Sequence, residues 1–430
     1  MKLFQKLLIT PAILGLLSPF SASATETNFK DVSNYSEGLV EVDSTTFDNQ
    51  SNVSPLLAGG EGLNNDQDNN FDSDSFSNTT TMSGSASFQV GAVDGSEITE
   101  AVTATYSYDI DLNTTFTGDD NLYVGIETGN SSSSVDFNLD SSGDGGDVLS
   151  VTSMYYQFPL GNYEVAVGPK LDSDDLMPTT TSTYSDSFFF GSQYGLASNF
   201  YASQGTGSGF AVARNFDNGW NASGSIIGNS ASTTSGFLTK EGNDIYTLSL
   251  GYNADNYGGG IVYQKSDSLC TLAEAYVSSI CTDLGVTAAL DEGYSSTTIG
   301  AYYNLGDQTT LSATSSINDL SINGVEVDTV ADFQFGVDRE LGDGTLSASW
   351  KTFPFYKVPD SNVDEVKGDD LGSFIELYYT YNVNDSLSIR PGVAFTMANS
   401  NAADIAAGSD DLAFYLVDRT AVGVGVDFKF

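Results

Sequence analysis

Side chains that commonly carry catalysis or bind metals are scarce in this chain of 430 residues, which has no histidine and only two cysteines. Without imidazole, the Ser-His-Asp and Cys-His nucleophile systems and any histidine-based zinc site are excluded. Cys270 and Cys281 lie in one polar stretch, and two thiols without further soft ligands make a poor metal site. We therefore expect a disulfide between them, no metal site, no cofactor and no enzyme activity.

Carboxylates are the abundant chemical groups, because the chain has 57 Asp and Glu against 14 Lys and Arg, a formal charge of −43. Neutralising the phosphates of a nucleic acid requires a basic patch that this balance does not supply. Nucleic acid is therefore excluded as a partner, and the remaining chemistry is electrostatic.

The carboxylates recur on one face of segments in which apolar and polar residues alternate with a period of two. In Ala101–Asn113, apolar residues at even positions alternate with Thr, Ser and Asp at odd positions, as in a strand with one apolar and one polar face. The same alternation places further charged residues on the polar face: Asp109, Asp111, Glu127, Glu164, Asp332, Glu376, Asp427, Arg390 and Lys429. If that face encloses water, its net negative field favours cations; alternatively, these are solvated residues without selectivity.

The elements that must position these residues are strands throughout. About sixteen candidates, roughly 14–18 when one hairpin is added or removed, fill residues 76–430, from Met82–Ala92 to Thr420–Phe430. Tight turns such as Thr117–Asp120 alternate with long polar connections such as Lys351–Asp370. This predicts an all-β transmembrane antiparallel barrel with short periplasmic turns and long external loops. A secreted sandwich or solenoid is the alternative.

The two ends of the chain carry distinct signals. Met1–Ala24 combines lysines, an apolar stretch and a small-residue end, which predicts a signal peptide and export. Thr25–Ser75 is polar without periodicity, which predicts a flexible segment. The last strand alternates up to Phe428 and Phe430, and we expect these aromatics to signal assembly to the barrel-assembly machinery.

The stretches SPLLAGGEGLN at Ser54–Asn64, FSNTTTMSGSASFQVGAVDG at Phe76–Gly95 and LNTTFTGDDNLYVGIETGN at Leu112–Asn130, with the opening 24 residues, resemble cyanobacterial outer-membrane porins. That family is related to OprB-type carbohydrate-selective porins. Only Phe29–Val32 is similar to the start of an S-layer-homology module, so the chain resembles members without a full one.

The resemblance implies an outer-membrane location, contact with outer-membrane lipid, and passive diffusion of small hydrophilic solutes and inorganic ions. A carbohydrate-preferring channel is the first alternative. A secreted acidic adhesin or surface-layer protein is the second, and homotrimer formation stays open.

The resemblance also implies that the long connection after the fifth strand, Pro169–Thr206 here, folds inward and narrows the channel. Its charged candidates for the constriction are Lys170, Asp172, Asp174 and Asp175. Its aromatic candidates are Phe188, Phe189, Phe190 and Tyr194. We expect the aromatic rings to pack against the wall; the alternative is that they stack on sugar rings.

Overall fold

The computed structural model describes residues 79–95, 102–130, 146–184, 205–229, 232, 236–239, 242–267, 294–322, 325–357, 365–397 and 419–430. The expected signal peptide and flexible N-terminal segment lie outside these residues and stay predictions. Among the described residues, no helix is long and apolar enough to cross a membrane.

Sixteen strands make up the fold, which confirms the predicted number. They are β1 (Thr80–Gly95), β2 (Val102–Thr114), β3 (Asn121–Gly129), β4 (Ser150–Leu160), β5 (Tyr163–Asp172), β6 (Thr206–Asn215), β7 (Trp220–Gly228), β8 (Asp244–Asn253), β9 (Tyr257–Ser266), β10 (Tyr294–Asn304), β11 (Thr309–Ile322), β12 (Val325–Leu341), β13 (Gly344–Lys357), β14 (Glu365–Asn384), β15 (Leu387–Met397) and β16 (Arg419–Lys429).

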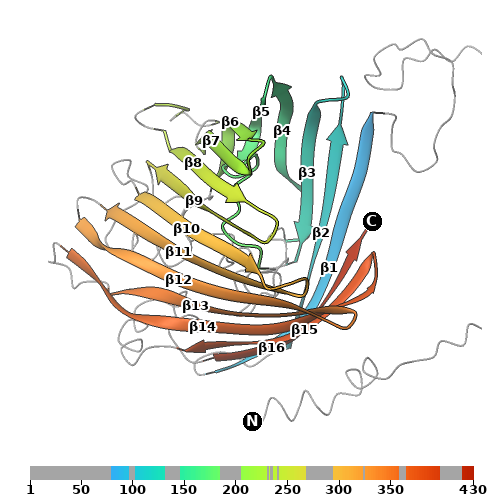
Figure 1. The fold of residues 1–430 in the computed structure, drawn as a ribbon, viewed down its shortest axis with the longest axis vertical. Coiled ribbons are helices and arrows are strands. Elements are labelled where there is room, and N and C mark those ends of the chain that lie inside the picture. Colours follow the sequence, from blue (N-terminus) through green and yellow to red (C-terminus); the bar gives the residue numbers. More distant parts are fainter. Residues whose placement is uncertain are drawn as a thin grey trace, which may run out of the picture. The chain divides into compact units, whose positions relative to one another are not determined.

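Each strand pairs antiparallel with the next, and β16 pairs with β1 to close the barrel. In Figure 1 the colours run around the wall from blue β1 to red β16, which returns beside β1. Among the described strands, a short parallel pairing between β12 and β14 is added to this order. Closure gives every described strand a partner on both sides, which is the property that a spanning sheet requires.

The period-two alternation produces an apolar outer face and a polar inner face. In β1, the Phe88 side chain is 49% exposed on the outside, whereas Ser87 and Gln89, on the other face, are 8% and 2% exposed. Directly paired residues share a face, so the register carries this assignment from strand to strand around the barrel. The exposed large side chains are therefore apolar, the reverse of a water-soluble barrel.

Two predicted connections contain more strand than expected. β5 continues through Lys170 to Asp172, because a register shift between Gly168 and Leu171 lets the ladder with β6 resume beyond Pro169. The expected loop Lys351–Asp370 is likewise largely strand, since β13 runs to Lys357 and β14 begins at Glu365. Its aromatic residues favour extended backbone, and another register shift at Phe353/Phe355 accommodates the proline between them.

Candidate functional site: the inner wall and an inward-folded segment

The residues that follow β5, Ser173–Tyr184, run along the inside of the barrel; we call them the inner segment. At its start, the carbonyl oxygen of Ser173 accepts a hydrogen bond from Ser225 on β7 (2.7 Å), and the Ser173 hydroxyl accepts one from Gln264 on β9 (3.2 Å). Further along, the Thr179 hydroxyl contacts Asn221 Oδ1 at 2.9 Å and Ser249 Oγ at 2.7 Å. All four partners lie on the inner face.

The end of the inner segment reaches the strands that follow. The Thr183 amide donates to Ser312 Oγ on β11 (3.3 Å), and the Tyr184 hydroxyl donates to Glu376 Oε1 on β14 (2.7 Å). The Tyr184 ring also meets the Tyr378 ring edge-on, with centroids 6.4 Å apart. The segment thus contacts the wall from β7 to β14 and occupies part of the lumen.

Glycines on the inner face make room for this contact. A Cβ atom at Gly260 would collide with the Thr179 methyl group, and one at Gly300 would collide with the Thr181 carbonyl oxygen. The segment therefore lies closer to β9 and β10 than any larger residue would allow.

The inner segment also has an apolar anchor. Leu176 packs against an inward-facing cluster, which breaks the polar pattern of the inner face and consists of Tyr155, Ala166, Leu171, Ala211, Ile227 and Ile245. Sequence reasoning missed Leu176 and assigned the anchoring role to Phe188–Phe190 and Tyr194. The signal that could have revealed the anchor was the inward parity of Ile227 and Ile245 on strands with otherwise polar inner faces.

Two of the predicted constriction carboxylates, Asp174 and Asp175, belong to the inner segment. The Asp174 side chain keeps contact with water, but partial desolvation by the surrounding chain raises its pKa to about 6, and the charge of Asp172 adds to the shift. The same causes raise the pKa of Asp175 to about 7. Burial, with the nearby charge of Glu376, also raises the pKa of the Tyr184 hydroxyl, so this group stays a neutral donor.

The other two charged candidates for the constriction lie outside the inner segment. Lys170 and Asp172 are the last residues of β5 and its ladder, so their assignment to a loop was wrong. Lys170 pairs with Met154 of β4, and its ammonium group donates to the Val151 carbonyl oxygen. Asp172 accepts a hydrogen bond from Thr206 of β6.

The predicted pore-lining carboxylates lie at inner-face positions of their strands. Asp109 accepts a hydrogen bond from Ser85 (3.0 Å) and is paired in register with Glu127; Asp111 accepts one from Tyr123 (2.6 Å). Glu164 is exposed near the turn between β4 and β5. For Asp332, only the backbone is described, and it pairs with Ser316 of β11.

Arg390 forms a buried ion pair rather than a free cationic site. Its guanidinium group donates to both carboxylate oxygens of Asp427, at 2.7 and 2.6 Å, and the Arg390 side chain is 7% exposed. Asp427 also accepts hydrogen bonds from Ser87 (2.5 Å) and Ser388 (3.4 Å). This network joins β15, β16 and β1 at the point of closure, and it neutralises the charge of Arg390.

Sequence reasoning missed further inner-face charges, two of which lie on β12 and β13. Lys351 of β13 is 2% exposed, and Asp338 of β12 accepts a hydrogen bond from Ser347 (2.6 Å). Asp338 has the same inner-face parity as Gln334 on β12, and Lys351 has the same parity as Ser349 on β13. The alternation in the sequence could therefore have revealed both.

The terminal aromatics lie on the outer face at the same closure. The Phe430 backbone exchanges two hydrogen bonds with Gly84 of β1 (2.9 and 3.1 Å), and its ring stacks on Tyr108 of β2 with centroids 5.7 Å apart. A Cβ atom at Gly84 would approach the Phe430 ring to 2.6 Å. Phe428 is 46% exposed on the same face.

Several predicted sites lie outside the described residues, so the structure places neither them nor their contacts. They are Phe188, Phe189, Phe190, Tyr194, Cys270 and Cys281. The disulfide and the aromatic part of the constriction stay predictions.

No protein-family model and no curated protein matches the chain. Three similar solved structures are OprB of Pseudomonas putida (TM-score 0.56, 12% identity, covering 82% of this chain and 94% of that one), an anion-selective porin from Comamonas acidovorans (0.55, 14%, 82% and 99%) and an OmpT variant of Vibrio cholerae lacking loop L8 (0.52, 10%, 82% and 99%). At such identities the likeness concerns the fold, and it shows that this chain has the sixteen-stranded barrel fold of bacterial outer-membrane porins.

Proposed function

We propose that this protein is an outer-membrane porin, exported by its N-terminal signal peptide, which forms a water-filled and weakly cation-selective channel for small hydrophilic solutes and inorganic ions. The observation that carries the proposal is the inverted polarity of a closed barrel, with apolar side chains outside and hydroxyl, amide and charged side chains inside. Passive diffusion through the lumen of such a barrel requires no cofactor and no catalysis. The cyanobacterial relationship and homotrimer formation remain part of the proposal.

The outer face supports a membrane environment. Exposed aromatic rings gather at the end of the barrel that carries the short turns, as in the aromatic girdle of a membrane barrel. They include Phe116, Tyr163, Phe216, Trp220, Tyr257, Tyr303, Tyr381 and Phe430. A secreted adhesin, the alternative from another functional class, does not need such a ring of exposed aromatic side chains around a closed barrel.

The inner charges support cation preference. Carboxylates on the inner face or inner segment outnumber the described inner-face bases, which are Lys351, Arg390 and Lys429. Since Asp427 pairs with Arg390, this pair contributes little net field to the lumen.

The inner aromatic side chains favour general diffusion over a carbohydrate-specific channel. Tyr155, Tyr184 and Tyr378 are at most 9% exposed, so their rings are committed to packing and are not available to stack on sugar rings. The carbohydrate alternative therefore depends on the half-buried inner rings of Tyr123 and Tyr302, or on residues outside the described part of the chain.

Single-channel recording of the full chain in a planar lipid bilayer tests the proposal. We expect stepwise conductance and, across a tenfold KCl gradient, a cation-selective reversal potential that is larger near 0.1 M than near 1 M, because the screening length falls from about 10 Å to about 3 Å. Added sugars should leave the conductance largely unchanged. Heat-denatured protein is the control. Folded protein without conductance contradicts the channel, and anion selectivity at both salt concentrations contradicts the selectivity alone.

A further inference from the structure

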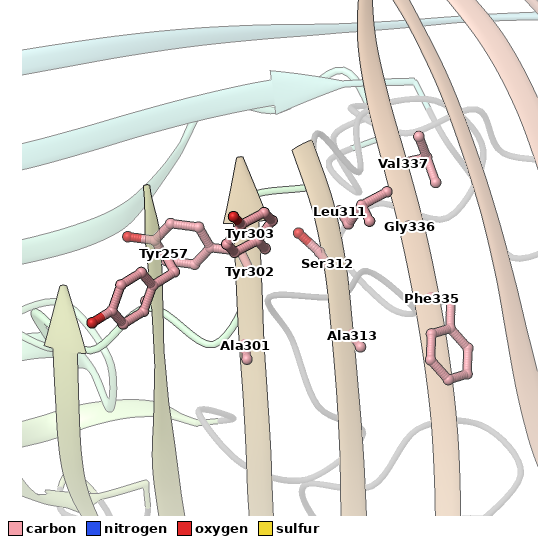
Figure 2. A pocket seen from close by; sticks show the side chains of 11 residues that line it. Tyr257, Ala301, Tyr302, Tyr303, Leu311, Ser312, Ala313, Phe335, Gly336 and Val337 are labelled. Atoms are coloured by element: carbon pink, nitrogen blue, oxygen red, sulfur yellow. The ribbon is translucent and has the colours of Figure 1, made fainter. Parts of the chain in front are cut away.

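An apolar groove lies on the outer face of β9–β12, with a volume of about 540 Å³. Ala301 and Ala313, two small residues on adjacent strands, leave a hollow between larger side chains that include Tyr303, Leu311 and Phe335. Figure 2 shows these side chains around the hollow, with Val337 of β12 at one end.

A cation lies beyond one end of this groove. Arg339 follows Val337 by two positions on β12, so it occupies the same outer face about 7 Å further toward the short turn to β13. Leu311 pairs with Val337 and Thr309 with Arg339, which confirms the shared face. The Arg339 side chain is exposed and forms no ion pair within the described part of the chain.

The distribution of charged residues over the rest of the outer face makes the position of Arg339 significant. Among outward-facing strand residues whose side chains are described, the cations near the short turns are Arg214 and Arg339, and carboxylates occur only near the long connections, at Asp94, Asp172, Asp244 and Asp319. Arg214 stacks on the Tyr163 and Phe216 rings, with its guanidinium carbon 5.1 and 4.6 Å from the ring centroids. Two outer cations therefore share one level of a strongly acidic protein.

Resting on the proposed function, we propose that this groove binds one phospholipid of the leaflet next to the short turns, with an acyl chain over Ala301 and Ala313 and the phosphate group on Arg339. An apolar groove ending at a cation matches an acyl chain that ends at an anionic headgroup. A second copy of the chain matches less well, because its described outward-facing strand residues carry no carboxylate at this level; the nearest described carboxylates, such as Asp307 and Asp343, lie in the short turns.

Native mass spectrometry of the full chain in non-ionic detergent, titrated with a long-chain phosphatidylglycerol, tests the proposal. We expect one retained lipid per chain, an apparent affinity about fivefold lower for Arg339→Gln, and loss of the bound lipid for Ala313→Phe, whose ring fills the groove. Glycerol phosphate, which has the phosphate but no acyl chain, should not bind. Lys265→Gln, which removes an outward lysine at the opposite end of β9, is the matched control and should bind as the unmodified chain does.

Equal lipid retention in all variants, or an equal loss in Lys265→Gln and Arg339→Gln, overturns the proposal. If Ala313→Phe instead breaks up an oligomer while lipid retention is unchanged, the groove belongs to a second copy of the chain. The variants should conduct as the unmodified chain does, so loss of lipid binding with intact conductance leaves the proposed function standing. Absence of conductance from every sample contradicts the channel independently.

Discussion

Asp120 shows how one side chain fixes a turn. Its Oδ1 accepts hydrogen bonds from the backbone amides of Phe116 (3.0 Å) and Thr117 (2.7 Å), and its Oδ2 accepts one from the Tyr156 hydroxyl (2.6 Å). These bonds, of which the one from Tyr156 has the largest effect, hold the pKa of the Asp120 carboxyl well below its usual range. The charged form therefore links the β2–β3 turn to β4.

Because the pKa of Asp120 is lower in the folded chain than in the unfolded chain, its contribution to stability is present above about pH 4 and is lost as the pH falls further. We expect Asp120→Asn to unfold at lower urea concentration at pH 7 and to lose less stability than the unmodified chain between pH 5 and pH 3. Asp119→Asn, at the exposed neighbouring position, is the control. Equal urea midpoints for the two variants at pH 7 would contradict this role.

At the scale of elements, the seam where β16 meets β1 combines contacts on both faces of the wall. Phe430 lies over Gly84 and Tyr108 on the outside, and Arg390 holds Asp427 on the inside. We expect Phe430→Ala to lower the yield of folded, heat-modifiable barrel several-fold. Phe210→Ala, which truncates an outward ring in the middle of β6, should lower it much less. Similar yields of the two variants would show that the seam has no special part in assembly.

The inner side of the seam yields a second prediction. Arg390→Gln should destabilise the barrel by about 3 kcal/mol, because it leaves the Asp427 carboxylate enclosed without its counter-ion. Adding Asp427→Asn should recover most of this loss, since both charges are then absent. Urea unfolding of the two single variants and the double variant measures the coupling. Additive losses would mean that the two side chains act independently.

Some structural features could be predicted from the sequence and others could not, because some depend on neighbouring residues and others on contacts between distant segments. The sixteen strands and their short turns depend on local alternation and turn residues, so they were predictable, as was the inner-face position of Asp109. The extension of β5 past Pro169 depends on a register shift, which only the neighbouring strand determines. The pairing of Arg390 with Asp427 and the contact of Tyr184 with Glu376 depend on which strands become neighbours and where the inner segment lies.

At the scale of the whole molecule, the inner segment makes ion selectivity depend on pH. The carboxyls of Asp175 and Asp174 have pKa values near 7 and 6, so they take up protons as the pH falls from 8 to 5, and the lumen loses negative charge. We expect the cation preference, measured as a reversal potential at about 0.1 M KCl, to decrease over this range.

The double variant Asp174→Asn/Asp175→Asn should show a weaker cation preference at pH 8 and little change down to pH 5. Asp217→Asn, at an exposed short turn, is the control and should retain the full pH dependence. A double variant that titrates as the unmodified channel does would assign the pH dependence to other carboxylates.

The pairing of β1 with β16 also determines the order in which the wall can form. The hydrogen bond from Ser87 to Asp427 joins residues 340 positions apart, whereas that from Ser85 to Asp109 spans 24. Bringing the more distant pair together costs about 2.3 kcal/mol more chain entropy, unless intervening hairpins have already shortened the path. The hairpins are therefore expected to form before the seam. Until β16 pairs with β1, one edge of β1 has unsatisfied amide and carbonyl groups with which a strand of another chain can pair. We therefore expect a nascent chain of this protein to avoid aggregation best when another molecule covers that edge.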